Sequence, residues 1–515
     1  MAIFTTIRKR GSDSSSNAGD SPIMRSETSQ EKIVDASQSG TKDEASTATI
    51  IRRPTHISDE EGQVVDIHGH DANDAFGSEE GAAIQYKTMH WWHTAARTYS
   101  SYRIDSSSST TSRHLLIAEN ISLGVLALPS AVAALGLVPG LLLIFFLGVI
   151  AGYTGYILGQ FKQAFPQVTC YADMGGVVAG KTGQIIFATG SCLILIFIMA
   201  AHILSFSIAM NVITDHSQCT LLYMVVGLLL SFILGLPRTM KGVSFLSVSS
   251  CVSVVIAVTV VIIAVAITKP DVGNIMAVGK SRPVVEGLNP VMYIILAFTG
   301  HAGFPSFIAE MKNPRDFPKA LLFMQIMAVS FYMLIAAVIY YYAGPYVASP
   351  ALGSAGPIVR KVAYGLAMPT IVIAGVANGS VVTKYVYIRV WRGTNVIHET
   401  SFKSIGSWIG ICAATWTTSW LIAEAIPNFN ILLGLIGSLL GSWISYGIPA
   451  ALWLYMNKGR MFSTRSKICL TILNVGIVIL GALICILGMW SSGWELAHGR
   501  AGRVFSCDNN WNPSH

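Results

Sequence analysis

Charged side chains are scarce in this sequence. Asp, Glu, Lys and Arg make up 12% of its 515 residues, about half of the ~25% found in an average soluble domain. Much of that charge lies in residues 1–113 and in short loops, which leaves long apolar runs across residues 114–490. A large soluble core would not be so poor in charge, and β-barrel strands would alternate apolar and polar residues, which these runs do not. The composition therefore predicts an all-α integral membrane protein.

Motifs for catalysis, nucleotide binding and metal binding are missing. The sequence has no P-loop, no H-E-x-x-H, no G-x-S-x-G and no Cys/His set with metal-ligand spacing. We therefore expect no enzyme activity, no metal and no cofactor, and the lack of a nucleotide domain argues against an ATP-driven pump. The net charge of +7 is not arranged as a basic stripe interleaved with aromatic residues, so no nucleic acid partner is expected.

The eight cysteines are scattered, and none of them form a C-x-x-C pair. This spacing predicts neither a zinc site nor a disulfide scaffold. We expect most of them to lie in or at the ends of helices as small apolar residues. Cys219 and Cys507 are a pair that could both face the outside, where a disulfide is the alternative to two free thiols.

The apolar runs divide into separate membrane spans. A helix needs roughly 20 residues to cross the hydrocarbon core, which predicts about eleven transmembrane helices. No signal peptide is recognisable at the start, so the first span is expected to act as the insertion signal. The expected spans are 114–136, 138–161, 184–213, 219–236, 243–267, 288–309, 319–343, 363–388, 405–425, 430–455 and 467–490.

The chain before the first span is polar. Residues 1–81 are rich in Ser, Asp, Glu, Gly and Thr and lack apolar periodicity, which is typical of disorder. Trp91 and Trp92 suit a membrane interface, and residues 97–113 turn polar again. We expect three parts, namely a cytoplasmic, largely disordered tail over residues 1–113, a membrane domain over residues 114–490 and a short C-terminal tail over residues 491–515.

Lys and Arg are unevenly divided between alternate loops. If the N-terminal tail is inside, the inner loops hold more of them than the outer loops do, and such residues favour the cytoplasmic side. The inner loops would contain Lys162, Lys181, Arg238, Lys241, Lys312, Arg315, Lys319, Lys384, Arg389, Arg392, Lys403, Lys458, Arg460, Arg465 and Lys467. The N-terminus is therefore predicted to be cytoplasmic, and an odd number of spans places the C-terminus outside.

Two apolar spans share an irregularity. Gly124-Val-Leu-Ala-Leu-Pro129 and Gly300-His-Ala-Gly-Phe-Pro305 each place a Gly five residues before a Pro. Gly loosens a helix, and Pro removes a backbone donor and clashes with the preceding turn. A broken helix is tolerated in hydrocarbon only where it is buried in protein or lines a watery cavity. Paired breaks in two halves of a chain indicate a transporter's binding site.

An acid precedes the first of these irregular stretches. Glu119 would lie roughly 7 Å below Gly124 on a continuous helix, and Ser122 would share its face. A carboxylate at this depth is costly unless it is paired, protonated or facing water. Glu119 is therefore a candidate for binding a coupling proton. The alternatives are a structural acid held by a cation or by freed amides, and a shallower acid at the interface.

The second irregular stretch offers backbone groups as ligands. Amides at a half-helix N-terminus carry partial positive charge and can hold a carboxylate, while unwound carbonyls can hold an ammonium. An α-amino acid presents both groups at a fixed distance. His301 is a candidate ligand or proton carrier, and the alternative is a buried, hydrogen-bonded histidine. Asn378 and Ser380, in a small-residue stretch of the eighth span, either line the same site or serve close helix packing.

Five motifs follow one another along the chain. They are Ala-Glu-Asn-Ile-Ser-Leu-Gly-Val-Leu-Ala-Leu-Pro (118–129), Tyr-Thr-Gly-Tyr-Ile-Leu-Gly-Gln-Phe (153–161), Leu-Pro-Arg-Thr (236–239), Ala-Phe-Thr-Gly-His-Ala-Gly-Phe-Pro-Ser-Phe (297–307) and Lys-Asn-Pro-Arg-Asp-Phe-Pro-Lys-Ala (312–320). Together these motifs resemble the amino acid/auxin permease family, and most closely its fungal neutral amino acid permeases of the methyltryptophan-resistance type. The resemblance covers about residues 82–490.

This resemblance implies a fold, an activity and a site. The fold would be a LeuT-like 5+5 inverted repeat of spans with an eleventh helix added. The activity would be proton-coupled uptake of neutral, including aromatic, amino acids at the plasma membrane. The substrate-binding residues would be Ser122, Leu123, Gly124, Phe298, Thr299 and Gly300.

One stretch departs from that family. In relatives the Trp-Trp segment runs into the first span through a few apolar residues, whereas here residues 97–113 intervene. This polar stretch is either a cytoplasmic insertion or a translated intron in the gene model. It shortens the inner half of the first helix and would bring Glu119 nearer to the cytoplasmic surface.

The main hypothesis is a secondary transporter that carries a neutral amino acid inward together with a proton by alternating access. The expected partners are the amino acid, the proton and the lipid bilayer. A vacuolar transporter and a non-transporting amino acid sensor with the same fold are the alternatives. Sodium is the rival coupling ion.

Overall fold

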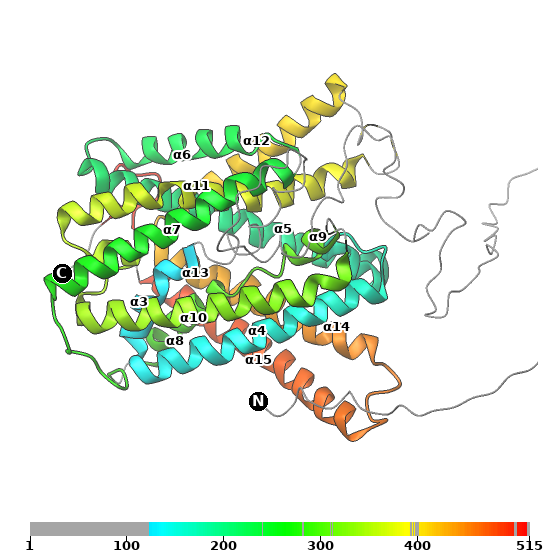
Figure 1. The fold of residues 1–515 in the computed structure, drawn as a ribbon. Coiled ribbons are helices and arrows are strands. Elements are labelled where there is room, and N and C mark those ends of the chain that lie inside the picture. Colours follow the sequence, from blue (N-terminus) through cyan, green and yellow to red (C-terminus); the bar gives the residue numbers. More distant parts are fainter. Residues whose placement is uncertain are drawn as a thin grey trace, which may run out of the picture. The chain divides into compact units, whose positions relative to one another are not determined.

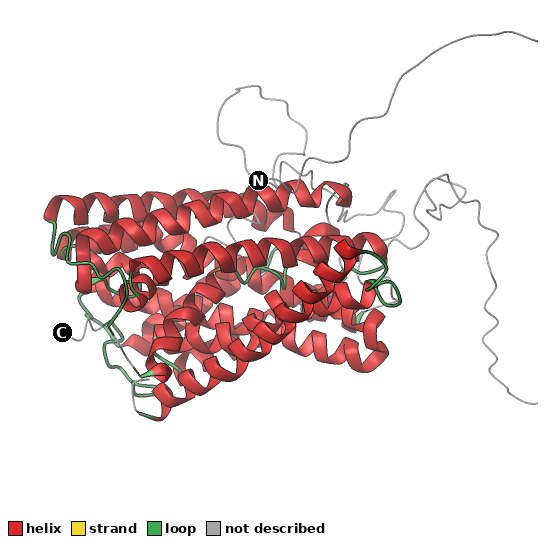
Figure 2. Ribbon diagram, turned by 90° about the horizontal axis from the view of Figure 1, so that it is seen from below, coloured by secondary structure: helices red, strands yellow, loops and turns green. Residues whose placement is uncertain are grey.

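The part of the chain that Figure 1 shows in colour consists of helices joined by loops. This computed structural model describes residues 123–238, 240–280, 283–309, 311, 313–391, 394, 396, 401–498 and 502–511. Within these ranges the chain forms helices and connecting loops and no extended strand (Figure 2). The predicted all-α class is therefore confirmed. The predicted tail over residues 1–113 lies outside the described residues.

The helices occupy the stretches that the apolar runs predict. The second half of the first span is α3, the span 288–309 is divided into two helices, and the span 430–455 is continuous but changes its helical type. Their bounds are α3 (Leu123–Leu135), α4 (Leu137–Ala164), α5 (Tyr171–Thr214), α6 (Thr220–Leu234), α7 (Met240–Thr268), α8 (Val284–Ala297), α9 (Phe304–Ala309), η1 (Pro314–Asp316), α10 (Phe317–Ala343), η2 (Gly344–Tyr346), η3 (Ala351–Ser354), α11 (Pro357–Val390), α12 (Phe402–Ala425), α13 (Phe429–Leu435), η5 (Ile436–Gly447), α14 (Ile448–Met456) and α15 (Arg465–Ala497).

Length and hydropathy identify membrane-crossing segments among these helices. Seven helical segments of the described chain are long and apolar enough to cross a bilayer. Shorter apolar helices accompany them at Gly124–Leu135, Thr220–Leu234 and Val284–Ala297. Short or interrupted spans are a known feature of transporters, whose half-helices end near the middle of the membrane. The expected total of about eleven spans stays a prediction.

The described helices pack in two groups. In the first, α3 packs against α8 and α10, and α4 packs against α10 and α9. In the second, α5 packs against α11, α12 and α6, and α11 also packs against α7. The segment α13–η5–α14 lies against α8, α5, α4 and α15. The irregular span that is split into α8 and α9 therefore belongs to the same group as α3, the other span with a Gly–Pro irregularity.

A sharp bend explains why α5 is longer than its predicted span of 184–213. Ala179 and Gly180 leave the helical region, and Gly180 has φ 59° and ψ −146°. A positive φ costs a glycine nothing. The two arms of the bend are so close that a Cβ at Gly183 would lie 2.8 Å from the Cβ of Ala179. The first arm, Tyr171 onward, is less apolar than the second, which is why hydropathy predicts only the second.

The tenth span contains a long π-helix, η5, which the sequence analysis does not predict. Its wide turns bring glycines directly onto neighbouring backbone. A Cβ at Gly437 would clash with the carbonyl oxygen of Met292 in α8, and a Cβ at Gly441 would lie 3.0 Å from Thr299 Oγ1. π-Helical turns often occur at functional sites. Here the π-helix lets the tenth span pack closely along α8 up to the point where α8 ends.

We expect Gly437→Ala to destabilise the packing of η5 on α8. The added methyl group meets main-chain atoms that cannot rotate away, and overpacking of this kind costs about 1–3 kcal/mol. Gly476→Ala in α15 is the matched control, because a Cβ there has nothing within 4 Å. Thermal unfolding of the detergent-solubilised protein measures the difference. Equal melting temperatures for the two variants would contradict the close packing of η5.

Candidate functional site

The span predicted over residues 288–309 is interrupted in its middle. α8 ends at Ala297, α9 begins at Phe304, and the residues between them are buried and not helical. Among the described contacts, the amides of Gly300, His301 and Ala302 donate no backbone hydrogen bond. Buried backbone groups are nearly always paired, and an unpaired one is costly. This interruption, residues 298–303, is called the break below, and its free amides suit an anionic group.

Local chemistry explains where α8 ends and where α9 begins. The hydroxyl of Tyr332 in α10 donates to the carbonyl of Ala297 at 3.1 Å, and Thr299 Oγ1 donates to the carbonyl of Ile295 at 2.8 Å. These bonds satisfy carbonyls that the ended helix leaves free. Pro305 lies in the first turn of α9, where a missing N–H is no loss. The phenyl ring of Phe298 packs on Tyr332 at a centroid distance of 5.3 Å.

The sequence predicts an interruption in both irregular spans, but the described part of the first span has none. Its described part is helical from Leu123 onward and carries Pro129 inside α3. The expectation of an unwound Gly124–Pro129 stretch is therefore wrong. One lost helix hydrogen bond is tolerated in a membrane helix that is enclosed by its neighbours. Glu119 and Ser122 lie outside the described residues, so a break before Leu123 stays a prediction.

The two irregular spans nevertheless meet at the break. A Cβ at Gly124 would lie 2.5 Å from the Cα of Ala297. The crossing of α3 and α8 is therefore so close that only glycine fits at this point, one residue before the break. The structure thus places Gly124 against Ala297, the residue directly before Phe298, Thr299 and Gly300 in the chain. The resemblance assigns Gly124 and those three residues to substrate. Nothing is described of the Leu123 side chain.

His301 is held inside the protein by α4. Its ring is 1% exposed, and its Nε2 lies 3.0 Å from the carbonyl oxygen of Ala151 and 3.0 Å from Thr154 Oγ1. A carbonyl can only accept, so we assign the ring proton to Nε2. The ring also packs on Phe304 at 4.8 Å. These contacts support the buried, hydrogen-bonded histidine among the alternatives, and proton transfer by His301 stays a prediction.

Asn378 and Ser380 lie in the middle of α11. Asn378 Nδ2 donates to the carbonyl of Ala374 at 2.9 Å, and Ser380 Oγ donates to the carbonyl of Val376 at 2.9 Å. The Asn378 Oδ1 atom is buried and accepts no hydrogen bond. α11 packs mainly against α7, α5 and α12 rather than against α8. No contact described here brings these side chains to the break, so their part in the site stays a prediction.

Sequence reasoning missed the residues of α4 that reach the break. Thr154 lies in the Tyr-Thr-Gly-Tyr motif, which the family resemblance includes but to which we assign no role from the sequence. Glu424, near the end of α12, is an acid that the sequence leads us to expect at the membrane interface. In the structure it is 2% exposed, and its Oε1 atom accepts no hydrogen bond.

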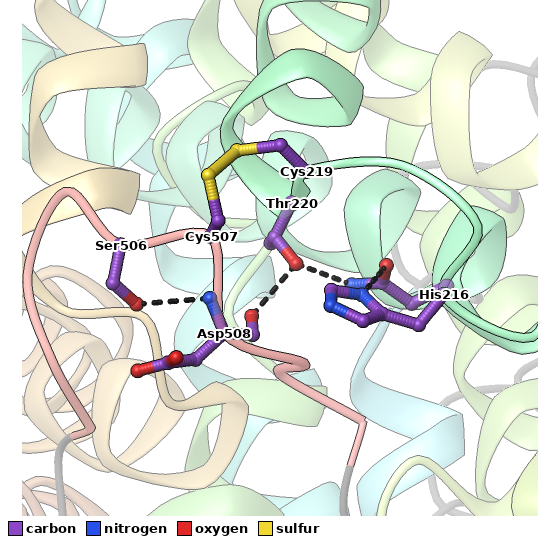
Figure 3. The surroundings of a disulfide bond; sticks show 7 residues. His216, Cys219, Thr220, Ser506, Cys507 and Asp508 are labelled. Atoms are coloured by element: carbon purple, nitrogen blue, oxygen red, sulfur yellow. Dashed lines mark hydrogen bonds between the residues drawn. A yellow bond between two sulfur atoms is a disulfide. The ribbon is translucent and has the colours of Figure 1, made fainter.

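Cys219 and Cys507 form a disulfide, which is one of the two alternatives that the sequence left open for this pair. The scattered spacing of the cysteines therefore did not exclude a disulfide. Figure 3 shows the bond between the start of α6 and the segment that follows α15. The residues are separated by 288 positions in the sequence. No spacing rule connects two cysteines so far apart, and only their shared side of the membrane pointed to the pair.

The arrangement of helices is similar to that of a solved structure, MhsT. Its structure, described as a complex with L-phenylalanine, has a TM-score of 0.51 to this chain at 12% sequence identity. The match covers 74% of this chain and 98% of that one. At this identity it establishes the fold, in agreement with the LeuT-like class that the resemblance implied.

Sequence comparison establishes the family. The model of the family described as "Transmembrane amino acid transporter protein" matches residues 105–492, and the chain belongs to this family. The N amino acid transport system protein of Neurospora crassa is 32% identical over 406 residues, covering 76% of this chain and 86% of that protein. Amino acid transporter AVT1D of Arabidopsis thaliana is 25% identical, covering 69% and 65% respectively. The resemblance stated from the motifs is confirmed, and amino acid transport is the activity it supports.

We expect Thr154→Val to slow transport, whereas Thr154→Ser should not. Valine has nearly the same shape but removes the oxygen beside His301 Nε2. A hydrogen bond of ordinary strength corresponds to a roughly three- to tenfold change in rate if it holds the break in its working geometry. Initial uptake rates at matched surface expression measure the effect. Full activity of the valine variant would show that this contact does not matter for transport.

Proposed function

We propose that the chain is a secondary transporter that imports neutral, including aromatic, amino acids together with protons across the plasma membrane. The observation that carries the proposal is the buried break between α8 and α9, in a chain of an amino acid transporter family. The break begins directly after Ala297, the residue that meets Gly124 of α3. Alternating access would expose this site to each side of the membrane in turn.

The geometry of the break fits an α-amino acid. The consecutive amides of Gly300, His301 and Ala302 are free to bind a carboxylate, as backbone nests do. Phe298 and Ala302, which lie in the same stretch as these amides, are apolar, and the break carries no Asp, Glu, Lys or Arg, which favours an uncharged substrate. The similar MhsT structure holds L-phenylalanine, and this supports an aromatic amino acid among the substrates.

Proton coupling rests on Glu119, with His301 as the second candidate. The reason for Glu119 is the sequence position of an acid just before the helix that crosses the break. A carboxylate in such surroundings is stabilised in its protonated form, so it can load a proton on one side and release it on the other. Sodium coupling is the alternative, and replacing external sodium with choline distinguishes the two.

The disulfide supports the proposed orientation. Disulfides persist in oxidising compartments, so Cys219 and Cys507 are expected on the non-cytoplasmic side. This supports a C-terminal tail outside and, with the odd number of spans that we predict, an N-terminal tail in the cytoplasm. The vacuolar lumen is topologically equivalent to the outside, so a vacuolar transporter stays the alternative location. A sensor with the same fold would bind an amino acid without accumulating it.

Uptake of a radiolabelled neutral amino acid in a transport-deficient cell should rise as external pH falls and should collapse with a protonophore. The proton gradient is the proposed energy source, which explains both effects. Competition by unlabelled amino acids should be strong for neutral and aromatic ones and weak for Asp, Glu, Lys and Arg. Binding without accumulation at any pH would favour the sensor instead.

Glu119→Gln should retain exchange of amino acid across the membrane and lose concentrative uptake. Glutamine keeps the shape and polarity of the side chain but cannot carry a proton. Counterflow from preloaded cells measures exchange, and the steady-state accumulation ratio measures coupling. If the glutamine variant accumulates substrate as the natural chain does, the coupling proton binds elsewhere.

A further inference from the structure

The segment that follows α15 folds back onto the end of the domain where α5 finishes and α6 begins. Residues 502–511, here called the C-terminal strap, are joined to α6 by the disulfide between Cys507 and Cys219 (Figure 3). Beside this bond, Thr220 Oγ1 donates to the carbonyl of Asp508 at 2.7 Å. The strap is therefore attached both covalently and through a hydrogen bond to its backbone.

Asn510 anchors the strap in α5. Its Oδ1 accepts from Asn211 Nδ2 at 2.7 Å, and its Nδ2 donates to Ser207 Oγ at 2.7 Å. Ser207 and Asn211 are almost completely buried, at 0% and 1% exposure. Buried polar groups of this kind are costly to leave unpaired. The amide of Asn510 completes their hydrogen bonding, so this residue fits a site built for it rather than lying loosely on the surface.

Trp511 extends from this anchor to η3, the short helix between α10 and α11. Its indole fills the place where a Cβ of Gly353 would be. The guanidinium of Arg360 lies over the ring at 5.3 Å, and Tyr364 meets it edge-on at 6.0 Å. Cation–π and edge-to-face contacts both favour this geometry. Trp511 is thus partly buried between η3 and the first turns of α11.

η3 connects the strap to the candidate site. This short helix packs on α3, α7, α10 and α11. α3 in turn meets α8 at Gly124 and Ala297, one residue before the break. A chain of direct contacts therefore runs from the disulfide through Trp511 and η3 to α3. Any outward opening between α3 and α11 has to move η3, and moving η3 disturbs its contact with Trp511.

We propose that Trp511 is a positioning residue for transport, which holds η3 against α3 and thereby sets the balance between outward-closed and outward-open states. The proposal rests on the alternating access described under the proposed function. The disulfide contributes by keeping Trp511 at a high effective concentration beside η3, because a tethered group loses less entropy on docking than a free tail does.

An accessibility measurement tests the position of η3 directly. Ala351 lies in η3 and is 2% exposed, so a reporter introduced by Ala351→Cys should react slowly with a membrane-impermeant maleimide on intact cells. Adding Trp511→Ala should speed this labelling roughly three- to tenfold, the factor that an aromatic contact of ordinary strength represents. Removing the disulfide with Cys219→Ser and Cys507→Ser together should act in the same direction. Cells with each variant but without the reporter give the background.

Transport kinetics provide a second measurement. A larger outward-open fraction should lower the apparent KM for external substrate and also lower Vmax, because closure becomes harder. Gly353→Ala should imitate Trp511→Ala, since its methyl group would take the place of the indole. Gly356→Ala is the matched control, because a Cβ there has nothing within 4 Å. Phe505→Ala is the control within the strap, since Phe505 packs on Trp420.

Unchanged labelling and unchanged KM in the Trp511→Ala variant, at normal surface expression, would overturn the proposal. Equal effects of Gly353→Ala and Gly356→Ala would do the same. The labelling measurement does not depend on the identity of the substrate or of the coupling ion. Failure of the proposed transport activity would therefore leave the reporter result interpretable, and the two failures can be told apart.

Discussion

The cost of an unpaired backbone group in hydrocarbon constrains this molecule more than any other interaction. Helices satisfy that constraint along the described spans, because each amide finds its partner within the same segment. Residues 298–303 do not follow this pattern, and the protein compensates by burying them. Gly124 makes room for α3 beside the end of α8, while Tyr332 and Thr299 bind the carbonyls that α8 leaves free. The candidate site is what remains, namely the amides of Gly300, His301 and Ala302, which donate no backbone hydrogen bond among the described residues.

Hydropathy predicts most of the fold because the bilayer imposes one length and one polarity on every span. It predicts the ends of elements less well. The first arm of α5 contains polar residues, so its hydropathy is too low to predict it as part of a span, although it is helical from Tyr171. The π-helix η5 has the composition of an ordinary span, so nothing in its hydropathy separates it from an α-helix. Backbone conformation of this kind depends on what packs against the segment.

The site is predictable only in part, for a similar reason. Gly300, Gly303 and Pro305 predict the break from the sequence, because each of these residue types weakens the helix at its own position. Gly124 and Pro129 have the same spacing but different surroundings, and there the helix continues. Thr154, Asn510 and the Cys219–Cys507 bond act through partners that are far away in the sequence. No local pattern reports such partners, and a single sequence provides no other signal for them.

The two halves of the divided span have different neighbours. α8 packs chiefly on α3, α13, η5 and α15, and Tyr332 of α10 holds its last carbonyl. α9 packs on α4, and His301 ties the start of that half-helix to Ala151 and Thr154. The span therefore consists of two half-helices with different contacts, connected by the break, and is not one continuous helix. In the proposed transport cycle, one half-helix would move while the other keeps its contacts, and a path would then open on one face of the membrane without opening the opposite face.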